Sequence, residues 1–296
     1  MRVYLPLIPL IALLAACGRE PVPQPADVAA ATELRRGNGG DPGSLDPVRA
    51  EDLHAYRVLG DLYEGLLTAG ADGTAVPGVA QSWTVSEDGL VWRFRLRSDA
   101  FWSSGERVTA SHFVYGLRTA LDPAALSPNA FLLEPVMNAA EVMRGARAPD
   151  SLGIAADGEN VLEIRLAHPA PWLPTVLTMP IALPRLPDVH DDPGSFSEPG
   201  MFVGNGPYRL VSRRPGGEIL LERNPRFHAA DTVAIQKVRY LPIVDPVAEF
   251  NLYRAGGLDL TATVPPAQFE ALRRERPCEL VAAPGLGLYY LALDVT

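Results

Sequence analysis

The residues that could do chemistry are scattered along this chain and form no catalytic pattern. The five histidines stand singly, and the sequence has no Gly-x-Ser-x-Gly elbow, glycine-rich phosphate loop, His-Glu-x-x-His pair or Cys-x-x-Cys pair. His190-Asp191-Asp192 is the one place where a histidine is followed directly by two carboxylates. Adjacent residues in a proline-flanked segment are more typical of a solvated turn than of a metal site. The sequence therefore predicts no enzyme, no catalytic residue, no metal site and no cofactor.

The charge of the chain argues against a nucleic-acid partner. Its formal net charge is −9 and its isoelectric point is near 5.1. Binding to phosphate backbones requires lysine and arginine clustered on one face. The hydrophobic content of 47% in 296 residues is ample for one large core or two modest ones.

The N-terminus has the pattern of an export signal. The apolar run at residues 3–16 is too short to cross a hydrocarbon core of about 30 Å. Leu14-Ala15-Ala16-Cys17 is similar to the bacterial lipobox, whose cysteine is lipidated. We therefore expect a signal peptide at 1–16, a lipid anchor on Cys17 and a proline-rich flexible tether at 17–32. The alternative is an ordinary signal peptide with an incidental cysteine.

Alternating apolar and polar residues predict short β-strands. Two of them flank Ser86-Glu87-Asp88-Gly89, and Asp-Gly between alternating segments is typical of a hairpin. A second hairpin is expected around Pro215-Gly216-Gly217. The expected strands are 83–85, 90–97, 161–166, 208–212, 219–223, 238–241 and 286–293.

Capping residues predict the helices between these strands. Thr109 can cap a helix that ends before Asp122, and Asp245 can cap another that ends before Gly256. A third amphipathic helix is expected at 266–275. Because strands and helices alternate irregularly, the sequence predicts an α/β fold with mixed sheets rather than a strict βαβ repeat.

The sequence also predicts the backbone conformation of Gly206 and the state of Cys278. Asn205-Gly206-Pro207 reads as a tight turn in which Gly206 adopts a positive φ. Export would place the chain in an oxidising compartment, where cysteines pair. Lipidation of Cys17 would leave Cys278 without a partner in this sequence. It is then either a buried free thiol, which we favour, or paired with chain that is absent.

Several segments in order along the chain form a further pattern. They include Gly43-Ser44-Leu45-Asp46-Pro47, Asp61-Leu62-Tyr63-Glu64-Gly65, Phe94-Arg95-Leu96-Arg97, Asn205-Gly206-Pro207-Tyr208, Tyr253-Arg254-Ala255-Gly256 and Tyr289-Tyr290. Together they resemble the periplasmic oligopeptide-binding family (solute-binding protein family 5) of ABC peptide importers. Each segment alone is weak evidence, but the set covers the chain from about residue 33 onward.

The resemblance implies a fold of two lobes that close on a ligand. This chain would be the α/β first lobe of a two-lobed, class II or cluster C-like, periplasmic binding protein with mixed sheets, and the second lobe would be largely missing. Residues 33–63 and 187–288 would form the main part of the first lobe, 64–186 an inserted subdomain, and 289–296 the start of a hinge strand. The chain stops just after an apolar strand, so the sequence looks like a fragment.

The resemblance also implies candidate ligand-binding residues. Glu51, Asp52 and Leu53 fall where the first lobe offers backbone and a carboxylate to the peptide, although Asp52 replaces a glycine and Leu53 a valine. Asn129 stands where peptide binders commonly carry a ligand-stacking tyrosine. Tyr289 and Tyr290 fall on the hinge strand near the cleft.

The function implied is capture of oligopeptides and their delivery to an ABC permease in the inner membrane. The partners would be an oligopeptide and the permease, and the protein would be a monomeric lipoprotein in the periplasm or on the extracytoplasmic face. The lobe alone is expected to bind peptide weakly. Alternatives are a relative that binds dipeptides, nickel complexes, haem or a cell-wall peptide, and a non-transport peptide sensor. Ser127-Pro128, which agrees with the peptide-binder pattern, and Tyr253-Arg254-Ala255-Gly256 favour oligopeptides, whereas Asn129 favours another ligand.

Overall fold

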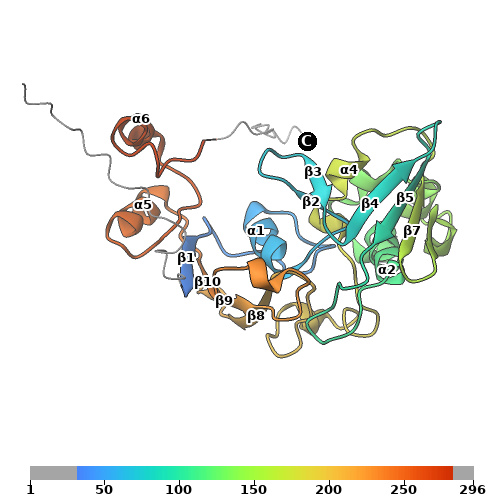
Figure 1. Ribbon diagram of the computed structural model, residues 1–296, viewed down its shortest axis with the longest axis horizontal. Coiled ribbons are helices and arrows are strands. Elements are labelled where there is room, and N and C mark those ends of the chain that lie inside the picture. The colour runs from blue at the N-terminus through green and yellow to red at the C-terminus, as the bar shows by residue number, and fades with distance from the viewer. Residues whose placement is uncertain (1–31, 283–296) are drawn as a thin grey trace, which may run out of the picture.

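Three β-sheets and their covering helices make up residues 32–282, the part of the chain that the computed structural model describes (Figure 1). The strands are β1 (Glu33–Gly37), β2 (Leu67–Ala69), β3 (Ala75–Pro77), β4 (Ala80–Val85), β5 (Val91–Leu96), β6 (Ile154–Asp157), β7 (Val161–Arg165), β8 (Tyr208–Arg213), β9 (Ile219–Arg223) and β10 (Lys237–Leu241). The α-helices are α1 (Leu53–Leu62), α2 (Ala110–Leu121), α3 (Ala139–Met143), α4 (Leu173–Val176), α5 (Pro246–Arg254) and α6 (Pro266–Glu275). The 3₁₀ turns are η1 (Pro123–Ala125), η2 (Ala130–Leu133), η3 (Pro149–Ser151), η4 (Pro180–Ala182), η5 (Pro193–Phe196) and η6 (Ala230–Thr232).

The first sheet joins the start of the described chain to a much later segment. Its strand order is β1-β10-β9-β8, with β1 parallel to β10 and the other pairs antiparallel. Helix α1 is tied to this sheet because the Tyr240 hydroxyl donates to Asp61 Oδ2 (2.7 Å). Burial raises the pKa of the Asp61 carboxyl. The mixed sheet and the hairpin around Gly216, whose φ is 67°, confirm the prediction.

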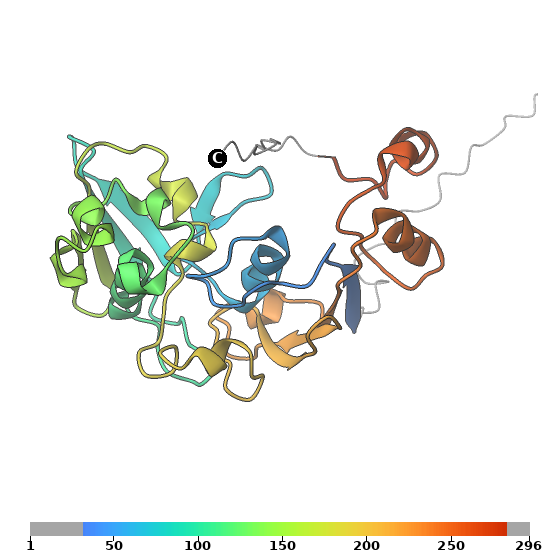
Figure 2. The same cartoon turned by 180° about the vertical axis from the view of Figure 1, so that it is seen from behind.

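The second four-stranded sheet lies at the other end of the molecule and is antiparallel, with the order β4-β5-β7-β6 (Figures 1 and 2). The third sheet is the pair β2-β3. The β4–β5 hairpin was predicted and is confirmed, with Trp92, Phe94 and Leu96 buried on one face of β5. Helix α2 packs against β6 and β7. Its predicted start is also confirmed, because the Thr109 backbone N–H donates to His112 Nδ1 (3.0 Å) in a capping box.

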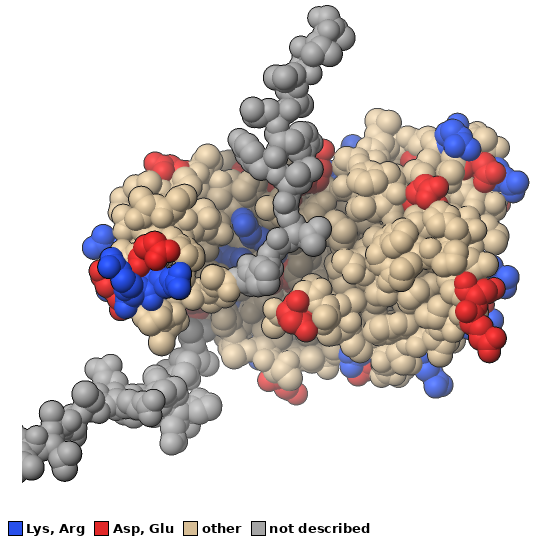
Figure 3. All heavy atoms as spheres, turned by 90° about the horizontal axis from the view of Figure 1, so that it is seen from above, with Lys and Arg blue, Asp and Glu red and all other residues tan. Residues whose placement is uncertain are grey.

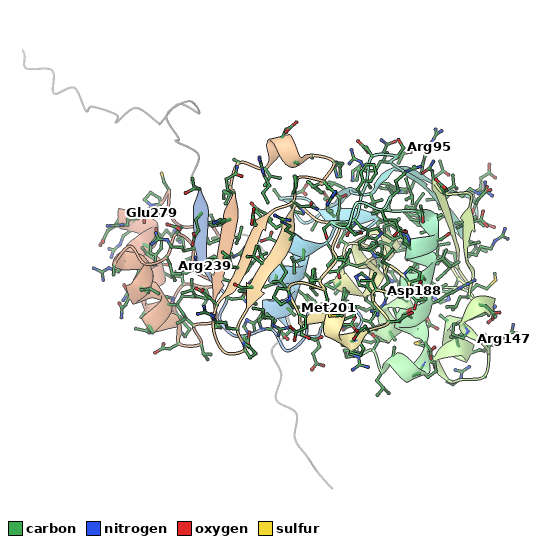
Figure 4. The ribbon with its side chains drawn as sticks, turned by 90° about the horizontal axis from the view of Figure 1, so that it is seen from below. Arg95, Arg147, Asp188, Met201, Arg239 and Glu279 are labelled. Carbon is green, nitrogen blue, oxygen red and sulfur yellow. The ribbon has the colours of Figure 1, made fainter. Side chains whose placement is uncertain are left out.

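One continuous hydrophobic core joins the two sheets. Leu59 and Leu62 of α1, with Leu66 and Leu67 just beyond it, are fully buried between them. Figure 4 shows the span of this arrangement from below, with Arg239 on the first sheet and Arg95 on the second near opposite ends of the side-chain-filled body.

Gly206 is required for a reason different from the predicted one. Its φ does not lie in the left-handed region, so the expectation of a positive φ was wrong. A Cβ there would lie 2.5 Å from both Leu62 C and Tyr63 N. The glycine therefore lets its loop touch the end of α1. Beside it, Asn205 Nδ2 donates to the Glu64 carbonyl (2.8 Å) and Asn205 Oδ1 accepts from Glu64 N (3.1 Å).

The expectation for Cys278 was also wrong, because this residue is exposed rather than buried. It follows α6 in a polar segment that buries no apolar residue. The predicted signal peptide, Cys17, the strand at 286–293 and the pair Tyr289-Tyr290 lie outside the described residues. In the stretch from 32 to 282, every helix is too short or too polar to cross a membrane.

Candidate functional site

The segment before α1 projects exposed side chains from a rigid base. Asp52 is the N-cap of α1, and its Oδ1 accepts from Ala55 N (2.7 Å) while its Oδ2 accepts from Gly43 N (3.1 Å). Both carboxylate oxygens therefore hold the loop and the helix together. Glu51 on one side is exposed, and Leu53 on the other is 66% exposed. Of the three predicted residues, Asp52 is structural and its two neighbours face solvent.

Asn129 connects this segment to the region of the second sheet. Its Nδ2 donates to the Ala50 carbonyl (2.9 Å) and to the Tyr56 hydroxyl oxygen (3.0 Å). Burial raises the pKa of Tyr56, so the phenol stays protonated at neutral pH. The structure thus brings together two candidates that the sequence could only name separately, the stretch around Glu51 and Asn129. We call residues 49–53 and 126–131 the ligand face.

The ligand face also exposes large apolar side chains that sequence reasoning missed. Leu126 is 81% exposed and Phe131 is 64% exposed. Leu126 also sits in the left-handed region with φ of 53°, which costs a leucine about 1–2 kcal/mol. Backbone strain of this kind is concentrated at binding segments. Leu126 and Phe131 flank Ser127-Pro128, a dipeptide that matches the family pattern. The sequence therefore carried a signal that could have pointed to this segment.

A cavity of about 340 Å³ lies behind residues 43–49, on the side of the loop where η5 packs. Its wall includes Arg185, whose Nη1 forms an ion pair with Asp46 Oδ1 (2.8 Å). The side chains of this pair are 6% and 15% exposed, so water screens them little. The Arg185 guanidinium also lies over the Phe196 ring, 4.9 Å from its centroid. The ion pair therefore fixes the Gly43–Pro47 loop on which the ligand face stands.

His190 lies in the same wall, and the expectation of a solvated turn was wrong for this residue. It is 2% exposed, with Nδ1 accepting from Leu186 N (2.9 Å) and Nε2 donating to the Val203 carbonyl (2.9 Å). Burial lowers its pKa to about 4, so the ring is neutral at pH 7. Asp191 and Asp192 are exposed. Residues 32–282 hold no cluster of three or more histidine, cysteine or acidic residues that could bind a metal.

The described residues form an α/β lobe with a mixed four-stranded sheet, and the strands of the antiparallel sheet lie between β1 and β8 in the sequence. The model of the bacterial extracellular solute-binding proteins, family 5 (Middle), matches residues 74–296, and the chain belongs to this family. This confirms the resemblance. The family consists of substrate-binding proteins.

Relatives agree over nearly all of the chain but only half of their own length. The periplasmic oligopeptide-binding protein OppA of Escherichia coli is 35% identical over 277 residues, which are 92% of this chain and 51% of OppA. The periplasmic murein peptide-binding protein MppA of the same organism is 35% identical over 276 residues, again 92% and 51%. Among solved structures, Haemophilus influenzae OppA in complex with the peptide RPPGFSPFR has a TM-score of 0.78 and 32% identity, covering 83% of this chain and 48% of that one.

Proposed function

We propose that this chain captures oligopeptides outside the cytoplasm for delivery to an ABC permease in the inner membrane, and that it does so by binding alone, without chemistry on the ligand. The observation that carries the proposal is the ligand face. It combines the exposed side chains of Glu51 and Leu53 at the capped start of α1 with exposed apolar side chains at residues 126–131, and Asn129 ties the two segments together. Its relatives OppA and MppA are named as peptide-binding proteins.

In this proposal the ligand's main chain supplies most of the affinity. An extended peptide hydrogen-bonds through its amides and carbonyls, which are the same in every sequence, and its side chains enter roomy surroundings. Glu51 would face the peptide directly, Leu53 would contact its side chains, and Asp52 would hold the segment in place. Tyr289 and Tyr290 would complete the wall from the hinge strand.

The architecture proposed around this face keeps the divisions drawn from the sequence. Residues 33–63 and 187–288 form the main part of the lobe, 64–186 an inserted subdomain and 289–296 the start of a hinge strand. A lipid on Cys17 would hold the protein at the membrane as a monomer beside its permease.

A cell-wall peptide is the second candidate ligand. The observation that favours it is the role of Asn129, whose amide is engaged with Ala50 and Tyr56 rather than offering an aromatic surface to a ligand. MppA, which is as similar to this chain as OppA, is named for murein peptides. Titration with a murein tripeptide beside an ordinary tripeptide separates the two candidates.

Calorimetric titration of the full chain with a set of tripeptides tests the function. We expect weak but saturable binding, as for a single lobe, with an affinity that varies by no more than about tenfold among unrelated sequences, because the main chain is what is recognised. A tripeptide with its central amide N-methylated should bind about tenfold or more weakly, because it lacks one donor. Binding that ignores N-methylation, or no saturable binding of any peptide, contradicts the proposal.

A further inference from the structure

The cavity behind residues 43–49 has a second property that peptide capture does not use. Three arginines line it, Arg49, Arg185 and Arg213, together with the carboxylates of Asp46 and Asp191. The cavity has a volume of about 340 Å³, which is within the range of small-molecule sites, and Arg49 in its wall is exposed to solvent. It is therefore large enough for a small ion or metabolite and accessible to it.

Each of the two carboxylates in the wall has a hydrogen-bond donor, but within the described residues only Asp46 is paired with a cation, so the three arginines outnumber the two carboxylates. Asp46 pairs with Arg185, and its Oδ1 also accepts from Val48 N (3.0 Å). Asp191 Oδ1 accepts from the Tyr115 hydroxyl. Arg185 donates hydrogen bonds from Nη1 to Asp46 Oδ1 and from Nη2 to the His190 carbonyl. Neutral His190 adds no charge.

The other two arginines keep free donors. Within residues 32–282, the Arg213 guanidinium makes one hydrogen bond, from Nη2 to the Pro42 carbonyl (2.9 Å), and forms no ion pair. Arg49 is exposed, and its side chain has neither an ion pair nor a hydrogen bond in that part of the chain. Two guanidinium groups without carboxylate partners thus face one cavity, in a protein whose net charge is −9. A concave wall concentrates such a positive field.

The surroundings suit an oxyanion rather than an apolar ligand. Ser44 and Thr119 add hydroxyl groups to the wall, and these can donate to an anion's oxygens. The planar guanidinium fork matches the geometry of carboxylate and phosphate oxygens. The exposed position of Arg49 lets it move onto a bound ion while Arg213 holds the ion from strand β8.

We propose that this cavity is a binding site for a small oxyanion, a phosphate or a carboxylate, held chiefly by Arg49 and Arg213 with the Arg185–Asp46 pair as its fixed floor. Arg49 belongs both to this site and to the ligand face, whereas Arg213 and the Arg185–Asp46 pair belong to this site alone.

Calorimetry of the full chain with sodium phosphate and with sodium acetate, at constant ionic strength, tests this site. We expect saturable binding of at least one of the two ions, and the ion that binds more tightly identifies the source as phosphate or carboxylate. Arg213→Gln and Arg49→Gln should each weaken that binding by about tenfold or more, because each removes charged donors.

The matched control is Arg209→Gln. Arg209 lies on the same strand but outside the cavity and pairs with Glu222 (3.4 Å). This variant should bind the ion within about twofold of the unchanged chain, since an exposed pair contributes little. Arg49→Gln removes no contact within the described residues, so it leaves the fold intact and reports on binding alone. The proposal is overturned if neither ion saturates the unchanged chain, or if all three variants bind alike.

Discussion

The junction between the two sheets and the ligand face are held in opposite ways. At the junction the contacts are buried and reciprocal: the Asn205–Glu64 bonds, the close approach of Gly206 to α1, and the Arg185–Asp46 pair. At the ligand face the side chains are exposed and one side chain, Asn129, links the two segments. We therefore expect changes at the junction to alter stability and changes at the ligand face to alter peptide binding. Changes at the two places should separate cleanly.

The largest effect should come from breaking the buried ion pair. Arg185→Met would leave the Asp46 carboxylate largely buried without its partner, which destabilises a protein by about 3–5 kcal/mol. Urea denaturation of the full chain measures this. Arg209→Met, at an exposed pair whose side chains are 49% and 42% accessible, should cost less than about 1 kcal/mol. Equal losses in the two variants would remove the distinction between junction and surface.

The next largest effect is the dependence of the unfolding free energy on pH through His190. Its folded pKa of about 4 lies below the ordinary value of 6.5, so the unfolded chain takes up the proton first as pH falls. The residue's contribution is complete above about pH 6.5 and is lost progressively towards pH 4, by about 3 kcal/mol in all. Unfolding free energies measured between pH 7 and pH 4 should therefore fall less steeply in His190→Gln. An equally steep fall in His190→Gln and in the unchanged chain would contradict this account.

Smaller changes in stability, opposite in sign, are expected when two glycines are replaced by alanine. Gly206→Ala should destabilise by about 1–3 kcal/mol, because its Cβ would meet backbone atoms of Leu62 and Tyr63. Gly60→Ala lies in α1, where an added Cβ meets nothing within 4 Å, and should stabilise by about 0.5–1 kcal/mol. Thermal unfolding of both variants checks the pair. A neutral Gly206→Ala would mean that the junction can relax.

At the ligand face, Asn129→Ala should affect peptide binding more than stability. Asn129→Ala removes two hydrogen bonds at a half-buried position, which costs about 1–2 kcal/mol. Peptide affinity, however, should fall by about tenfold, because residues 49–53 and 126–131 are no longer held in a fixed position relative to each other. Calorimetry and urea denaturation on the same sample give both quantities. A variant with unchanged peptide affinity would show that the link is only structural.

The two regions also differ in how far the sequence could predict them. The hairpins, α2 and α5 follow from local signals, such as Asp-Gly at a turn or Asp245 before Pro246, and these were found. The junction depends on residues far apart in the chain, as Asn205 and Glu64 are separated by 141 positions. No periodicity reveals such pairs. The sequence indicated that a glycine is needed at position 206. It could not tell whether the reason is a positive φ or, as the structure shows, the close approach of the loop to the end of α1.

The candidate site was only partly predictable for the same reason. Glu51, Leu53 and Asn129 were found through resemblance, whereas the contact between Asn129 and Ala50 required three-dimensional structure. The sequence analysis made no prediction for Leu126 and Phe131, and only their exposure in the structure draws attention to them. Seen from above, much of the surface is uncharged, with Lys, Arg, Asp and Glu gathered at the α6 end and along the opposite rim (Figure 3). Charge patterning therefore gave no pointer to the ligand face.

The central claim is that the ligand face binds the peptide main chain. Backbone NMR of the isotope-labelled full chain, titrated with a tripeptide, tests it most directly. The account predicts saturable shift changes at the amides of residues 50–54, Ser127 and 129–131, with the amides of α6 unaffected. Shift changes confined to α6 or to the outer sheet strands, with the ligand face silent, would contradict it.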